Sequence, residues 1–218
     1  MVREYRENMT RFFKEEFSGL GHFLKQYFTE TIIVLTAALF ISLDRYHVIK
    51  NGDFSTFLFY AVFPILVILI VLRKNPLNFG LGIGNFRIWW KYVLVTCLIA
   101  AAVLYAASFM PSLQKYYKQE HFNFLHYFLI TCLNLSAFEY LYRGYLLFGL
   151  KEKFKEGSIL IQTIPFVLLH LGKPEVETIS CLFTGILFGY IAYRGKSFWP
   201  VFLIHMFINV YFVWLINR

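Results

Sequence analysis

The chain has 218 residues, of which 58% are hydrophobic, 21% are aromatic and 16% are charged. Soluble domains carry about 25% charged residues, so this composition excludes an ordinary soluble protein and indicates a polytopic membrane protein. The formal net charge of +8 does not indicate nucleic-acid binding, because the basic residues are scattered between apolar stretches.

The N-terminal segment, residues 1–28, carries mixed charges. Its apolar side chains recur at spacings of three and four, at Phe13, Phe17, Leu20, Leu24 and Phe28. This periodicity predicts an amphipathic helix lying in the cytoplasmic interface of the membrane. We expect residues 1–28 to form an interfacial segment and residues 29–218 to form one transmembrane domain.

Seven apolar stretches follow along the chain, and short polar breaks separate them. A transmembrane helix needs about 20 apolar residues, so the shortest of these stretches lie at the lower limit for crossing. The pattern predicts an all-α polytopic bundle of about seven transmembrane helices, near residues 29–48, 56–72, 92–109, 122–149, 157–171, 178–193 and 198–216.

The 21 Lys and Arg residues can be sorted by side in this layout. Fourteen fall on the side of the N-terminus, six fall on the opposite side, and Arg143 lies within a span. Because cytoplasmic loops carry the excess of basic residues, we expect a cytoplasmic N-terminus, an external C-terminus and a bacterial plasma membrane as the location. The cysteines at 97, 132 and 181 lie in apolar stretches without ligand spacing, which is typical of small core residues.

Three spans contain polar residues that the layout otherwise excludes. The fourth span carries Glu139 and Arg143, the fifth carries His170, and the seventh carries His205 and Asn209. A spacing of four places Glu139 with Arg143, and His205 with Asn209, on one helical face. Counted from the cytoplasmic ends at ~1.5 Å per residue, Glu139, His170 and His205 lie at depths of roughly 16, 20 and 14 Å. We therefore expect them to meet in one layer that opens towards the cytoplasmic half of the bilayer.

These groups form a plausible hydrolytic set. Glu139 can take a proton from water, while one histidine shares that task, orients the water or binds a metal. The other histidine and the amide of Asn209 can donate hydrogen bonds to an oxyanion. Zinc or another divalent cation is compatible with two histidines and a glutamate, but the sequence does not require it, since no HExxH motif is present.

Each residue also has a structural explanation. Glu139 and Arg143 can form an ion pair that only fixes helix packing, a membrane histidine is often a packing residue, and Asn209 can bridge two helices. A transporter that uses Glu139 and the histidines as a proton relay is a further alternative, which the absence of repeated halves disfavours. The other histidines, His22, His47, His121 and His126, fall in interfacial or loop-proximal positions and receive no role.

The order of these motifs resembles the CAAX protease and bacteriocin-processing family, also called the CPBP or Abi family, which includes the type II CAAX prenyl endopeptidases. The resemblance covers about residues 120–214. Its motifs are Glu139-x-x-x-Arg143-Gly144, Phe166-x-x-x-His170, Gly172-Lys173-Pro174-x-x-Glu177 and His205-x-x-x-Asn209.

The resemblance implies an intramembrane endopeptidase that forms no acyl-enzyme. By position, Glu139 and His170 would activate water, His205 and Asn209 would stabilise the oxyanion, and Arg143 would hold the glutamate. Family members are commonly labelled metalloproteases. The implied partners are membrane lipid and a peptide or protein substrate, with a prenylated or membrane-bound protein as the family's best-known kind.

The sequence departs from the family pattern at one position. The first motif usually has two adjacent glutamates, and here the first of them is Phe138. Adjacent helix positions differ by about 100°, so Glu139 does not occupy the same spot without rotation of the helix. Two alternatives follow: a protease with a single glutamate, or an inactive family member that acts as a membrane immunity or scaffold protein.

Overall fold

The computed structural model describes residues 2–46 and 49–218, and no strand occurs within these ranges. Met1 of the predicted 1–28 segment, and His47 and Val48 of the predicted 29–48 span, lie outside the described residues. The α-helices are α1 (Val2–Gln26), α2 (Phe28–Arg45), α3 (Gly52–Phe57), α4 (Phe63–Leu66), α5 (Phe86–Ala107), α6 (Pro111–Tyr117), α7 (Phe124–Glu139), α8 (Leu147–Phe154), α9 (Gly157–Leu169), α10 (Glu175–Gly195) and α11 (Trp199–Asn217). The predicted all-α membrane bundle is confirmed.

Two of the long helical stretches contain π-helical segments. The segments η1 (Leu58–Val62), η2 (Val67–Val71) and η4 (Tyr140–Leu146) are π-helical, and η3 (Pro76–Phe79) is a 3₁₀ helix. η1 and η2 continue α3 and α4 into one span, and η4 joins α7 to α8. Single π-turns within α-helices are frequent at functional sites, and η4 begins at the residue after Glu139.

Five helical stretches are long and apolar enough to cross a membrane: Gly52–Val71, Phe86–Ala107, Phe124–Phe154, Glu175–Gly195 and Trp199–Asn217. The bent pair formed by α1 and α2 counts as a sixth if it is one span. Within the described residues, each of the seven predicted apolar stretches lies largely in helix, but α9 has only 13 residues and is too short to cross. The number of crossings by length and composition is therefore five or six among the described residues.

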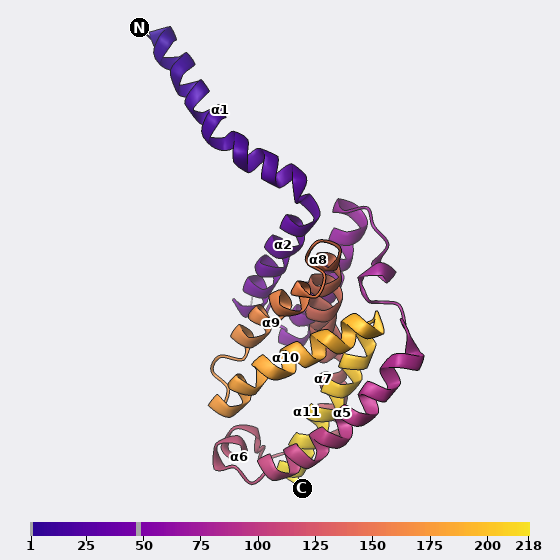
Figure 1. Ribbon diagram of the computed structural model, residues 1–218. Coiled ribbons are helices and arrows are strands. Elements are labelled where there is room, and N and C mark those ends of the chain that lie inside the picture. Colours follow the sequence, from indigo (N-terminus) through magenta and orange to yellow (C-terminus); the bar gives the residue numbers. More distant parts are fainter. Residues whose placement is uncertain (1, 47–48) are drawn as a thin grey trace.

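The helix α1 projects away from the bundle, whereas α2 packs within it (Figure 1). The two helices meet at an angle of 93°. The apolar side chains of α1, among them Phe13 and Phe17, are exposed. The interfacial position of α1 and the domain boundary at residue 28 stay predictions.

The core of the bundle surrounds η4. All seven residues from Tyr140 to Leu146 are buried, and they pack against side chains of α2, η1, α9 and the start of α11. The termini lie at opposite ends of the molecule, with the C-terminus beside α6 (Figure 1). The core thus holds the segment that carries Arg143 in the middle of the bundle.

The loop between η3 and α5 docks on the turn before α11. Backbone bonds join Asn85 to Gly195 and Phe198 to Gly80, and the Ser197 hydroxyl donates to the Gly82 carbonyl at 2.6 Å. At Gly84 the backbone has φ +64°, and an added Cβ would overlap the carbonyl oxygens of Gly195 and Lys196. Only glycine fits this approach.

We expect Gly84→Ala to destabilise the protein by about 2 kcal/mol or more, because it combines left-handed strain with a backbone clash. Thermal unfolding of the purified protein in detergent measures the change. Gly82→Ala is the matched control, since its Cβ would make only an ordinary contact at 3.6 Å. Equal melting temperatures for both variants would contradict this account of the loop.

Candidate active site

A chain of three buried polar side chains links α7, η4 and α11. The carboxylate of Glu139 lies 3.2 Å from Nη1 of Arg143 and 2.5 Å from Nδ1 of His205. Glu139 and Arg143 are completely buried, and His205 is 9% exposed. The predicted contact between Glu139 and Arg143 is therefore present, and Glu139 also contacts one of the two predicted histidines.

Aromatic rings enclose the guanidinium of Arg143. Its Cζ atom lies 4.0 Å from the ring centroid of Phe166, 5.4 Å from that of Phe188 and 5.8 Å from that of Tyr142. Nε and Nη2 of Arg143 have no hydrogen-bond partner among the residues that the structure describes. Cation–π attraction, about 2 kcal/mol at desolvated sites, stabilises the part of the cation that Glu139 does not reach.

His170 follows the last residue of α9, and its ring Nδ1 lies 2.7 Å from the carbonyl oxygen of Phe166. The backbone around it is held from three sides. Arg45 donates to the carbonyl of Leu169, and both Thr178 and the backbone N–H of Lys173 donate to the carbonyl of His170. These bonds place the imidazole at a defined position although it lies at a helix end.

Lys173 and Glu177, from the motif that follows His170, form a salt bridge of 2.7 Å. The hydroxyl of Tyr117 donates to the same carboxylate at 2.7 Å, which ties α6 to the start of α10. Burial and the nearby Glu177 carboxylate raise the pKa of the Tyr117 hydroxyl, so Tyr117 stays a neutral donor. These contacts stabilise the turn between α9 and α10, which begins at His170.

The ring of Phe138 borders both histidines. Its centroid is 6.3 Å from the ring centroid of His170 and 6.0 Å from that of His205. Phe166 also borders both imidazoles, at 4.7 and 6.4 Å. The side chain at position 138, rather than that at 139, therefore faces the space between His170 and His205, as the 100° rotation between neighbouring positions predicts.

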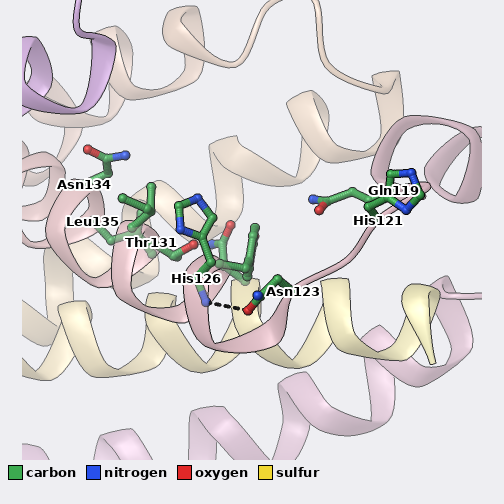
Figure 2. A pocket seen from close by; sticks show the side chains of 10 residues that line it. Gln119, His121, Asn123, His126, Thr131, Asn134 and Leu135 are labelled. Carbon is green, nitrogen blue, oxygen red and sulfur yellow. Dashed lines mark hydrogen bonds between the residues drawn. The ribbon is translucent and has the colours of Figure 1, made fainter.

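Asn209 lies one turn beyond His205 on α11. Its amide nitrogen donates to the backbone carbonyl of His205 at 3.2 Å. The side chain also lines a cavity of about 480 Å³ between α7 and α11, part of which Figure 2 shows. His121 and His126, to which the sequence gave no reason to assign a role, line the same cavity.

The predicted residues do not assemble into a metal centre. Within residues 2–46 and 49–218, no three His, Cys, Asp or Glu side chains lie together as metal ligands. Nδ1 of each histidine is engaged, with Glu139 or with Phe166. Catalytic zinc sites use three protein ligands that converge on one point, and this donor set does not fit that arrangement.

The comparison with protein families gives one match in the half of the chain that carries these residues. Residues 120–211 match the family described as type II CAAX prenyl endopeptidase Rce1-like. Residues 120–211 form an Rce1-like region. Neither the search of curated proteins nor the search of solved structures returned a match.

The match confirms the resemblance stated from the motifs. Because the Rce1-like family is a family of proteases, it supports a CAAX-type intramembrane protease kind of function. All five predicted site residues fall inside the Rce1-like region.

We expect Arg143→Met to destabilise the protein by about 3–5 kcal/mol, since it leaves the buried Glu139 carboxylate without its cation. The double variant Arg143→Met/Glu139→Gln should be less destabilised than Arg143→Met alone. Thermal unfolding in detergent measures the stability of the wild-type protein, the single variant and the double variant. Lys173→Met, which removes a partly exposed salt bridge, is the control and should cost about 1 kcal/mol or less. A double variant that is less stable than Arg143→Met would contradict the pairing.

Proposed function

We propose that the protein is a membrane-embedded endopeptidase of the CPBP kind, in which His205 activates the water that attacks a peptide bond. The observation that carries the proposal is the contact between Nδ1 of His205 and the buried Glu139 carboxylate inside the Rce1-like region. The proposed substrate is a membrane-bound peptide or protein, of which a prenylated chain is one form.

The contact determines which nitrogen of His205 acts as the base. A carboxylate accepts hydrogen bonds, so Nδ1 carries the proton and Nε2 has the free lone pair. Nε2 has no hydrogen-bond partner in the described part of the chain. The negative charge of Glu139 stabilises the imidazolium that forms when Nε2 takes a proton, as the carboxylate of a catalytic triad does.

In the proposed reaction, water attacks the carbonyl carbon of the scissile bond while Nε2 of His205 takes one proton from it. The tetrahedral intermediate then breaks its C–N bond, and the same nitrogen returns the proton to the leaving amine. The products are a carboxylic acid, which keeps the second proton of the water, and a neutral amine. The His205 ring returns to its starting state, and no covalent enzyme intermediate forms.

Two further side chains contact the reacting groups in this proposal. Because Nδ1–H of His170 donates to the carbonyl of Phe166, its Nε2 accepts a hydrogen bond from the second water hydrogen. Asn209 uses one N–H for the carbonyl of His205, and its second N–H is available to the oxyanion. The mechanism contains no step through a metal.

Glu139 and Arg143 are positioning residues in this scheme, which differs from the roles that the resemblance implies. The Glu139 carboxylate is completely buried and is shared between Arg143 and His205. It therefore acts on the water through His205. Arg143 keeps the carboxylate ionised and in place.

The position of Phe138 favours a second candidate, a non-catalytic membrane protein that binds a partner through the same region. A phenyl ring that borders both histidines stands at the sequence position where the family usually has a water-activating carboxylate. In that case the polar residues would support partner binding, as in an immunity or scaffold protein.

We expect Glu139→Gln to lower kcat by about 10³-fold or more with little change in KM, because the amide holds the wrong tautomer of His205. The assay follows cleavage of a library of membrane-anchored peptides in proteoliposomes. Insertion and folding are checked by size-exclusion elution. Glu156→Gln, at an exposed carboxylate outside the site, is the matched control and should keep full activity.

Unchanged cleavage by the Glu139→Gln protein would overturn the proposed role of the Glu139–His205 pair. If the wild-type protein cleaves no peptide but still binds one, the result favours the non-catalytic candidate.

A further inference from the structure

The cavity beside Asn209 is polar but carries no formal charge. Of its ten lining residues, none is Lys, Arg, Asp or Glu. The side chains that determine its character are amides, imidazoles and a hydroxyl, from Gln119, His121, His126, Thr131, Asn134 and Asn209. Figure 2 shows His126, Thr131 and Asn134 following one another along α7, with Gln119 and His121 on the approach to it.

The amide of Asn134, one of the lining residues, is held in place by a contact with α3. The Nδ2 group of Asn134 donates to Oδ1 of Asp53 on α3 at 2.6 Å, which fixes the direction of the amide. Its Oδ1 atom is buried and has no hydrogen-bond partner in the described ranges. A buried acceptor without a partner is destabilising, and this atom is closed off from the cavity, so the Asn134 amide shapes the wall of the cavity rather than binding a ligand.

The cavity lies close to the proposed base in the fold. Asn209 lines it and lies one turn from His205 on α11, and Leu135 lines it three positions before Phe138 on α7. From Asn123 to Asn134 the cavity follows eleven positions of α7, or ~16 Å at 1.5 Å per residue. An extended peptide of about five residues covers that length.

We propose that this cavity binds an extended, uncharged segment of the substrate polypeptide next to the scissile bond. This inference rests on the proposed endopeptidase function and adds the class of sequence that the site accepts. Peptide N–H and C=O groups match the amides of Asn209 and Gln119. A charged side chain in the cavity loses water without gaining a partner of opposite charge, and is therefore disfavoured.

The cavity also indicates from which side the peptide enters. Gln119 at its mouth donates its backbone N–H to Asn217 at the end of α11, and this end of the bundle lies opposite to α1 (Figure 1). The peptide therefore enters from the side of the C-terminus. This differs from the cytoplasmic opening expected from the depths of Glu139, His170 and His205, because those depths placed the layer but not the access to it.

The test uses the full-length Glu139→Gln protein, whose folding is checked by size-exclusion elution, in proteoliposomes with the photo-crosslinker p-benzoylphenylalanine in place of Thr131. The probe is a membrane-anchored peptide library with a randomised stretch of about eight residues, longer than the roughly five that fit. We expect capture of peptides depleted about tenfold in charged residues relative to the input, which corresponds to ~1.4 kcal/mol of discrimination. The same crosslinker in place of Thr184 on α10, which does not line the cavity, should capture few peptides and without this selection.

Charged residues as frequent in the captured peptides as in the input would overturn the proposal, as would equal capture from the two positions. The outcome separates this proposal from the protease function. Selective capture of peptides that the wild-type protein never cleaves would support the cavity and contradict the protease. Cleavage of peptides that residue 131 does not capture would contradict the cavity alone.

Discussion

The structure depends on the pairing of a buried carboxylate with two nitrogen groups. Glu139 is completely enclosed, and its oxygens contact the guanidinium of Arg143 and the imidazole of His205. A lone carboxylate in such a low-dielectric place is strongly disfavoured, so the chain must bring both partners to it. The π-helical turn after Glu139, the rings around Arg143 and the close docking of α11 on α7 all serve this contact.

The same pairing limits the chemistry. Because both partners of Glu139 are already in contact with it, Glu139 acts on a water only through the His205 ring. Phe138, the residue before it, borders both histidines. Nε2 of His205 is left as the group able to take a proton. The polar cavity lined by Asn209 lies one helical turn from His205, which is why we propose it as the binding place of the substrate peptide.

Much of this arrangement could be predicted from the sequence. The polar breaks between apolar stretches indicated where the helices lie. The spacing of four predicted the contact between Glu139 and Arg143, and the similar depths of Glu139 and His205 predicted that they lie in one layer. The sequence could not predict which of the two histidines, His170 or His205, contacts Glu139, because spacing does not determine how each helix is rotated about its axis. The cavity could not be predicted from the sequence. Asn134 is a single amide in an apolar helix, and His121 and His126 lie near a loop. These three residues come together with Asn209 only when α7 packs against α11. The short α9 also looked like a span, since composition does not show that a helix ends at His170.

The most direct test of the account is the tautomer of His205, measured by ¹⁵N NMR on protein with labelled histidine in lipid nanodiscs. The account predicts a neutral ring with the proton on Nδ1 and an unprotonated Nε2, and a shift of the proton towards Nε2 in the Glu139→Gln variant. His170 serves as the internal reference, because its Nδ1 faces the carbonyl of Phe166 instead. A proton on Nε2 of His205 in the wild-type protein, or the same tautomer in both proteins, would contradict the central claim.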